Sequence, residues 1–350
     1  MAQKITYYLL VTLVLSLGFG QLLRFDYYTV PIYLHDILVV FLLVTLYYKE
    51  RFFVIPKHLY VFGLSIVLSS SYALLIYSLS ELLVPALYLL RLLAYIALYL
   101  LLKKSKISIH QKYIQIAGCT SLIIGLAQYI FMPDMRLFQY LGWDDHLYRL
   151  TLPHFDPTFA GVMLALMGLS TPRYFVAYMI AVLFTYSRST WLSLVATGML
   201  TLKNTKLLLT YMCIYMLLVL SLPRTFGEGT NLVRLFSFQS RLQTDFKYLD
   251  IYKNDLVLGR GLNTLALEKA DSKYPNHATG PNSSYLYLLL TTGVLGLIGW
   301  GIFMKNVYLS SHHKPMLIFF FVASLFNNVM FYPFALLWVL LVEATVPTST

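Results

Sequence analysis

Charged residues are scarce in this sequence. They make up 12% of its 350 residues, about half the share found in ordinary soluble domains. Hydrophobic residues make up 59%, and the mean hydropathy is +0.69. So few polar side chains could not cover a water-soluble globule of this size, and an aromatic content of 16% is the opposite of a disordered composition. We therefore expect lipid to surround most of the chain.

Cysteine is nearly absent too. Cys119 and Cys213 lie in apolar runs, where we expect small core side chains and neither a disulfide nor a redox pair. His, Cys and acidic residues do not recur at metal-ligand spacing. Gly259-Arg260-Gly261 lacks the preceding strand and the third glycine of a dinucleotide-binding loop. The sequence therefore predicts no metal site and no cofactor.

Long apolar windows are abundant instead. They are too long for strands and lack the alternation of barrel strands, and only helices or closed barrels satisfy every backbone group in lipid. The sequence predicts an all-α polytopic membrane protein with about 12 transmembrane helices, within a range of 10 to 13, in a single domain over residues 1–350. The windows are residues 5–23, 30–48, 59–79, 82–102, 113–131, 158–170, 174–186, 190–202, 207–222, 284–303, 316–332 and 334–341.

Basic residues mark one side of this arrangement. With the N-terminus in the cytoplasm, the inner loops hold 13 of the 26 basic residues, against the acidic Glu50 and Glu343. This is the bias of cytoplasmic loops, so we expect both termini in the cytoplasm. Orientation accounts for most of the net charge of +11, and no nucleic-acid partner is predicted.

The basic residues at outer and intramembrane positions differ in kind. The inner set has 11 Lys and 2 Arg, whereas the other set has 9 Arg and 4 Lys. Orientation requires only positive charge, while the planar guanidinium suits bidentate binding of phosphate or carboxylate. An anionic ligand on the outer face is one interpretation. Arginines paired with outer acids as loop scaffolding are the other.

Two outer loops are long, residues 132–157 and 223–283. In the second, an apolar stripe at helical spacing predicts an amphipathic helix from Arg241 to Leu258, ending at Gly259-Arg260-Gly261. Arg188 lies between two short apolar windows, where an uncompensated cation is costly and is a functional candidate. Arg91 lies near the middle of window 82–102, and both a structural pair with Asp36 and a contact to a lipid phosphate are open.

Four segments resemble the bacterial O-antigen polymerase and O-antigen ligase superfamily, and the resemblance covers essentially the whole chain. Arg149 followed by Asp156-Pro157-Thr158 is similar to the family's arginine and Asp-Pro-Asn, with Thr158 in place of Asn. Ser187-Arg188 is similar to the Ser-Arg turn between two short helices. Arg241 with the following helix and its glycines looks like the large-loop arginine and its Gly-x-Gly end.

The fourth segment is Asn282-Ser-Ser-Tyr-Leu with the later Gly293 and Gly296, similar to a His-Asn-x-Tyr-Leu and Gly-x-x-Gly pattern. Asn282 stands where the family has His, which argues against the ligase branch. We also expect Gly293, Gly296 and Gly299 to allow close helix packing, and Asn327 and Asn328 to bond across helices.

The resemblance implies a GT-C-like glycosyltransferase in the bacterial inner membrane that polymerises undecaprenyl-pyrophosphate-linked oligosaccharide repeat units on the periplasmic face. The implied partners are the lipid-linked donor and acceptor, the bilayer, a chain-length regulator and a flippase. Two rivals remain: an O-antigen ligase acting on a lipid core, and a flippase or transporter of the same lipid-linked sugar. A transporter typically has inverted repeats, and the sequence shows none.

The site residues follow from the chemistry. A departing lipid pyrophosphate needs fixed cations, and Arg188 and Arg241 are the catalytic candidates. A base with a pKa near ambient pH suits proton removal, which favours His277, with His146, His154, Asp145 and Asp156 as alternatives. The substrate-binding candidates are Arg149, Asp156, Arg260, Asn282 and Arg91.

Overall fold

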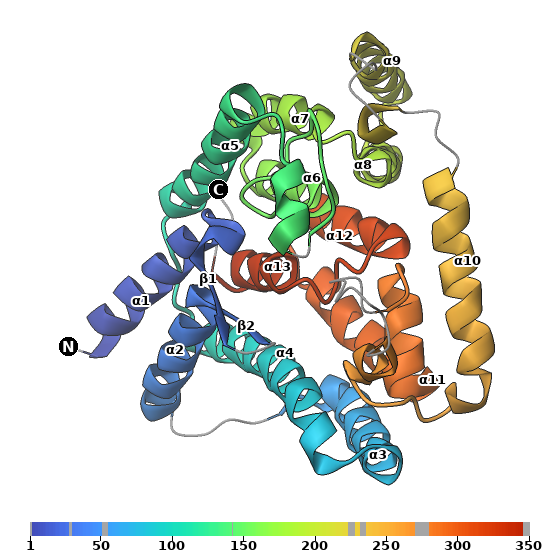
Figure 1. The fold of residues 1–350 in the computed structure, drawn as a ribbon. Helices are drawn as coiled ribbons and strands as arrows, with labels where there is room; N and C mark the ends of the chain where they lie inside the picture. The colour runs from blue at the N-terminus through green and yellow to red at the C-terminus, as the bar shows by residue number, and fades with distance from the viewer. Residues whose placement is uncertain are drawn as a thin grey trace.

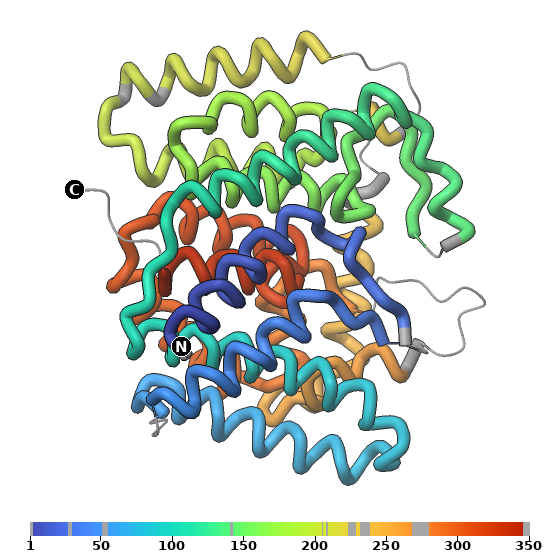
Figure 2. The backbone as a smooth tube through the Cα atoms, turned by 90° about the vertical axis from the view of Figure 1, so that its left-hand side faces the viewer, coloured from blue at the N-terminus to red at the C-terminus, as the bar shows by residue number. Residues whose placement is uncertain are grey.

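The computed structural model describes residues 2–27, 30–50, 55–141, 143–222, 228–231, 236–269 and 280–345. Its α-helices are α1 (Ala2–Leu17), α2 (Leu34–Glu50), α3 (Tyr60–Ile76), α4 (Leu79–Ser105), α5 (Gln111–Phe131), α6 (Pro157–Ser170), α7 (Phe175–Leu183), α8 (Arg188–Thr201), α9 (Thr205–Ser221), α10 (Phe236–Ile251), α11 (Ser284–Leu309), α12 (Lys314–Phe326) and α13 (Pro333–Thr345). Most of the chain is helical, and many of the helices run side by side across the molecule (Figure 2).

The predicted apolar windows coincide with helices, with three corrections at their ends. Window 30–48 was expected to be helical throughout, but it begins with strand β2 (Val30–Tyr33), which pairs antiparallel with β1 (Arg24–Tyr27). The hairpin satisfies these backbone groups without a helix. Window 5–23 leaves the α-helix at Leu17, and window 316–332 leaves it at Phe326.

Within the described residues, four helical segments are long and apolar enough to cross a membrane: Lys57–Ile76, Leu79–Ser105, Gln111–Phe131 and Ser284–Leu309. Helices α6 and α7 form a pair bent by 119°, which would add a fifth span as a broken helix. Other apolar helices, including α12 and α13, are shorter. The expected 12 spans and the sides of the loops stay predictions.

The core is built around α13, which lies at the centre of Figure 1. Every side chain from Phe334 to Val342 is buried, and α6 is buried along almost its whole length. A helix that is apolar on all sides is surrounded by protein or by lipid, and α13 is surrounded by protein, since it packs against α4, α6 and α1. These two short helices therefore form the interior, with longer helices outside.

A break in α11 is filled by the segment that follows α10. Gly293 has φ 70° and ψ −176°, a conformation open essentially to glycine alone. Around the break, the amides of Arg260 and Gly261 donate to the carbonyls of Leu290 and Thr291, and the Val294 amide donates to the Leu256 carbonyl. These bonds replace those that the helix loses there. Gly293 was expected to serve close packing, and it does so at a break in the helix.

Two other glycines of α11 fulfil the packing prediction more simply. A side chain at Gly299 would collide with the backbone of Phe62 in α3, and one at Gly296 would meet the side chains of Thr292 and Ser65. The close approach of α3 and α11 places the loop after α10 against both helices.

Candidate functional site

Helix α10 buries a mixed set of side chains, including Tyr248, and exposes another mixed set, including Lys247 and Asp250. Leu242 and Phe246, from the predicted apolar stripe, are 42% and 66% exposed. Arg241 and Asp245, one turn apart, are half-buried and bond to other helices. The helix was expected to run from Arg241 to Leu258, but it begins at Phe236 and ends at Ile251, because the chain then passes through a 3-10 turn at Lys253–Asp255.

Arg241 is held by the break between α12 and α13. Its Nη1 donates to Asn327 Oδ1 at 2.7 Å and lies 3.4 Å from the Phe326 carbonyl. Asn327 is buried, and its Nδ2 donates to Ser189 Oγ in α8 at 2.9 Å. The predicted cross-helix role of Asn327 is thereby confirmed. Among the described residues, no carboxylate forms an ion pair with Arg241.

Arg188 is the first residue of α8, next to Ser189 in the chain. Its charge and that of Arg241 are close enough to repel each other. A cation at a helix N-terminus is also disfavoured by the helix dipole, whereas an anion there is stabilised. The two predicted catalytic arginines are thus brought together from different helices, in an arrangement that an anion would relieve.

Arg149 supports the turn that carries Arg188. It is buried, and its Nε donates to the Thr185 carbonyl at 3.0 Å. The Leu150 amide donates to the neighbouring Phe184 carbonyl at 2.9 Å. Tyr186 follows with a φ of 52°, so the turn between α7 and α8 is tight. Arg149 was predicted to bind substrate, and in the structure it braces the backbone three residues before Arg188.

Asn282 lies on the other side of Arg241. Its backbone amide donates to Asp245 Oδ1 at 2.8 Å, and its side-chain Nδ2 is 3.4 Å from the same oxygen. Ser284, at the start of α11, donates to the Asn327 carbonyl at 3.0 Å. Helices α8, α10, α11 and α12 therefore meet at one set of polar residues, which we call the polar junction. It consists of Arg188, Ser189, Arg241, Asp245, Asn282 and Asn327.

Arg260 lies apart from the polar junction. Its Nε donates to Asp255 Oδ2 at 2.7 Å, and its guanidinium lies 5.1 Å from the centre of the Tyr252 ring. Asp255 also accepts from the Tyr72 hydroxyl at 2.9 Å. Arg260 was predicted to bind substrate. In the structure it forms an ion pair with Asp255, which connects the loop after α10 to α3 through Tyr72.

Of the two roles predicted for Arg91, the structure shows the ion pair with Asp36. Its Nε and Nη2 donate to the two oxygens of Asp36 at 3.0 and 2.8 Å, and Nη2 also donates to the Pro31 carbonyl at 2.6 Å. Tyr95 donates to Asp36 Oδ1 at 2.7 Å. The pair joins α2, β2 and α4, and no residue of the polar junction bonds to it among those described.

Asp156 and two histidines form a separate buried group. Asp156 caps α6 by accepting from the amides of Thr158 and Phe159 at 2.7 and 2.9 Å. His146 lies 3.9 Å from Asp156, and burial lowers the pKa of its imidazole to about 4. Burial lowers the pKa of His154 to about 3, and its Nδ1 pairs with the Tyr332 hydroxyl at 2.9 Å. Neither histidine is placed to act as an exposed base. Asp145 is exposed, and His277 lies outside the described residues.

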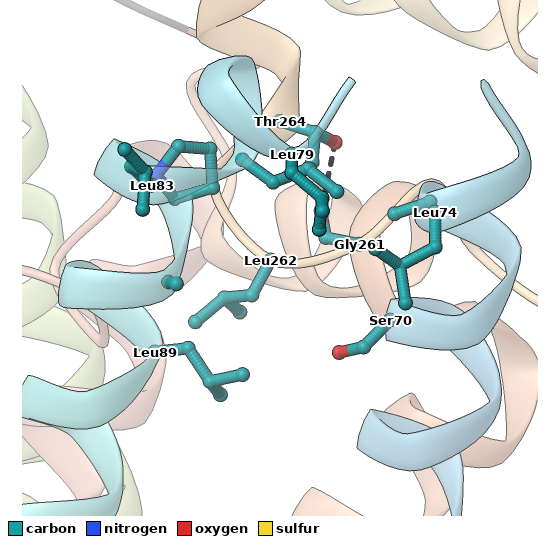
Figure 3. A pocket seen from close by; sticks show the side chains of 12 residues that line it. Ser70, Leu74, Leu79, Leu83, Leu89, Gly261, Leu262 and Thr264 are labelled. Carbon is teal, nitrogen blue, oxygen red and sulfur yellow. Dashed lines mark hydrogen bonds between the residues drawn. The ribbon is translucent and has the colours of Figure 1, made fainter. Parts of the chain in front are cut away.

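An apolar cavity of about 270 Å³ lies at the other end of the loop after α10. Figure 3 shows Ser70 and Leu74 of α3 on one side, Leu83 and Leu89 of α4 on the other, with Gly261, Leu262 and Thr264 closing it. Its lining does not include the residues of the polar junction. The cavity is lined on one side by Gly261, Leu262 and Thr264 of the large loop.

No protein-family model matches the chain, and no curated protein matches it. The family therefore stays an expectation from the four sequence segments. In the part of the chain that the structure describes, no three His, Cys, Asp or Glu side chains gather as metal ligands would.

Sequence reasoning missed Asp245 at the polar junction. It placed Asp245 among the charged residues of an amphipathic helix, where a solvated face is the ordinary assumption. One signal was available: Arg241 and Asp245 share a face at a spacing of four residues, next to the face of the exposed Leu242 and Phe246.

Proposed function

We propose that this chain is a membrane glycosyltransferase that extends a polysaccharide by joining polyprenyl-pyrophosphate-linked oligosaccharide units at the outer face of the bacterial inner membrane. The observation that carries the proposal is the pairing of Arg188 and Arg241 at the polar junction. Two arginines from separate helices are close enough for their charges to repel, and Arg241 is held in place by a neutral amide. Such an arrangement suits a diphosphate, which accepts several charge-assisted hydrogen bonds.

Glycosyl transfer from a lipid pyrophosphate requires fixed positive charge near the leaving group. When an acceptor hydroxyl attacks the anomeric carbon, the bond to the lipid pyrophosphate breaks and negative charge grows on the leaving oxygen. Fixed donors aimed at that charge stabilise the transition state more than the ground state. Asn327 and Arg149 contribute by fixing Arg241 and the turn before Arg188, so that little reorganisation is needed during the reaction.

The apolar surroundings support a lipid-linked substrate. The junction lies between apolar helices, and α10 presents Leu242 and Phe246 outward. A polyprenyl chain can lie along such a surface while its headgroup meets the arginines. The cavity between α3 and α4 is a further apolar space, separate from the junction.

Transport of the same lipid is the second candidate. Broken helices at ligand sites are typical of transporters, and α11 breaks at Gly293 while α6 and α7 are sharply bent. The α11 break, however, is filled by the backbone of residues 256–261, which takes up its hydrogen bonds. This favours a structural break over a ligand site.

The test uses purified protein in liposomes with lipid-linked oligosaccharide extracted from cells in which the gene is deleted. Growth of longer lipid-linked chains supports the polymerase. Transfer to lipid A-core acceptor alone would identify a ligase. Movement of the lipid across the bilayer without a new glycosidic bond would identify a transporter. Arg188→Ala and Arg241→Ala should abolish chain growth while the protein is still expressed, and Arg136→Ala, in an exposed pair with Asp134, is the matched control.

A further inference from the structure

We propose that Asp245 is the general base that deprotonates the acceptor hydroxyl, an inference that rests on the proposed glycosyl transfer. Asp245 is the acidic residue of the polar junction. It is half-buried and lies one turn along α10 from Arg241. A carboxylate held on the same side of the helix as one of the two arginines suits a role in the reaction.

The two oxygens of Asp245 have different surroundings. Oδ1 accepts from the amide of Asn282 at 2.8 Å and lies 3.4 Å from its Nδ2. Among the described residues, Oδ2 has no hydrogen-bond or ion-pair partner. The first oxygen fixes the carboxylate against α11, and the second remains able to accept a proton.

Three other described acids of the outer segments are engaged elsewhere or exposed. Asp255 pairs with Arg260 and accepts from Tyr72, and Asp156 caps α6. Asp250 is exposed on the far side of α10, where it pairs with Lys253. Asp245 is therefore the described acid best placed to serve the arginine pair.

The spacing also fits the reaction. Residues four apart on a helix have Cβ atoms about 5–6 Å from each other, so Arg241 and Asp245 can reach neighbouring parts of one sugar. Arg241 is tied to Asn327 and Asp245 to Asn282, and Ser284 links these two supports by its bond to the Asn327 carbonyl. The cation and the carboxylate therefore have a common frame.

In the proposed step, the acceptor O–H bond breaks and its proton moves to Asp245 Oδ2. The acceptor oxygen forms a bond to the anomeric carbon of the donor sugar. The bond from that carbon to the pyrophosphate oxygen breaks, and its electron pair leaves with the pyrophosphate, which Arg188 and Arg241 hold. Asp245 then releases its proton to water. No oxidant, reductant or further reactant is required.

The central experiment compares Asp245→Asn with wild type in the chain-growth assay, with lipid-linked oligosaccharide from the deletion strain as donor and acceptor. The amide oxygen of Asn can still accept from Asn282, but it cannot take the proton. We expect kcat to fall at least about 100-fold, the lower end of what a positioned base contributes. Binding of undecaprenyl diphosphate and thermal stability should stay close to wild type. Asp250→Asn is the matched control and should keep wild-type kcat.

Chemical rescue separates a base from a structural acceptor. Asp245→Ala removes the carboxylate, and added formate should restore part of its kcat, while formate should not affect wild type or Asp250→Asn. Formate could not repair a lost helix contact. His277→Ala tests the candidate base from the sequence, and a loss of kcat there with an active Asp245→Asn would assign the base to His277 instead.

Several outcomes would overturn the assignment. These are an Asp245→Asn enzyme with more than about a tenth of wild-type kcat, rescue that fails in a folded Asp245→Ala protein, and loss of activity only in His277→Ala. A parallel loss of undecaprenyl diphosphate binding in Asp245→Asn would make Asp245 a positioning residue instead. If wild type itself forms no glycosidic bond, the proposed function fails, which is distinct from active wild type with an active Asp245→Asn.

Discussion

Replacing Arg241 with Gln should weaken the binding of a polyprenyl diphosphate more than it weakens the fold. The substitution removes the positive charge and keeps a polar side chain near Asn327, which now accepts from Arg241 Nη1 at 2.7 Å. A hydrogen bond to a charged partner contributes about 1.5–3 kcal/mol. At 1.4 kcal/mol per factor of ten, the dissociation constant should rise roughly 10- to 150-fold.

The stability of the ligand-free protein should respond differently. Losing the charge-assisted bond to Asn327 costs about 1.5–3 kcal/mol, and the remaining amide of Gln and the loss of repulsion between Arg188 and Arg241 offset part of that cost. The free energy of unfolding should therefore fall by less than about 2 kcal/mol. A residue that served only as scaffolding would show the reverse, with weakened stability and unchanged binding.

The assay is titration of the detergent-purified protein with undecaprenyl diphosphate and undecaprenyl monophosphate, followed by thermal unfolding with and without each lipid. Wild type should bind undecaprenyl diphosphate more tightly than the monophosphate. The ratio of the two dissociation constants should be smaller in Arg241→Gln and in Arg188→Gln. In the double variant the losses should not add, because both groups hold one ligand. Arg136→Gln is the control, since Arg136 is exposed and bound to Asp134. Wild-type affinity in both single variants would refute the reasoning, as would an equal loss in the control.

Three further predictions concern the fold. Arg91→Gln leaves the Asp36 carboxylate without its cation and should lower the free energy of unfolding by about 3–5 kcal/mol. In chemical unfolding, the double variant Asp36→Asn/Arg91→Gln should recover much of that loss. A fully stable single variant would contradict the pairing. Gly293→Ala forces a side chain into the α11 break against the Val257 backbone and should lower the melting temperature, whereas Gly301→Ala in the same helix meets open space and should not. Burial lowers the pKa of His146 from 6.5 to about 4, so as the pH falls this histidine is protonated in the unfolded chain before it is protonated in the folded protein. The resulting stabilisation of about 3 kcal/mol is present above pH 6.5 and should be lost as the pH falls toward 4. Thermal unfolding at pH 7.5 and 4.5 should show a smaller acid loss for His146→Gln than for wild type or for the exposed control His312→Gln.

The helices were predictable because their signal is local. A long apolar run cannot leave its backbone unpaired in lipid, so the windows fell on helices without knowledge of the fold. The Arg91–Asp36 pair could be proposed from the sequence, because a charge in an apolar window is costly unless an opposite charge compensates it. The β1–β2 hairpin was missed, since Val30–Tyr33 is apolar and continues directly into α2.

The candidate site was only partly predictable. Arg188 and Arg241 stood out as costly cations, but nothing in the sequence says that the break at Asn327 joins them. Arg260 looked similar to them, yet its carboxylate partner Asp255 lies only five residues away in a turn. Asp245 was missed because the usual rule places the charged side chains of an amphipathic helix in water, and here Asp245 is half-buried on the side that also buries Tyr248. Its partner, the amide of Asn282, is 37 residues away in the sequence, and a local pattern does not reveal such a partner.

The exposed apolar side chains of α10 make the surrounding medium a structural partner. Arg241 and Asp245 bond to other helices and Tyr248 is buried on the inner side, while Leu242 and Phe246 are exposed among the described residues. In a bilayer, acyl chains would pack against these exposed side chains from outside. Preparations that replace annular lipid with short-chain detergent should therefore loosen the arginine–carboxylate arrangement, and restoring long-chain phospholipid should tighten it again without any change in the sequence.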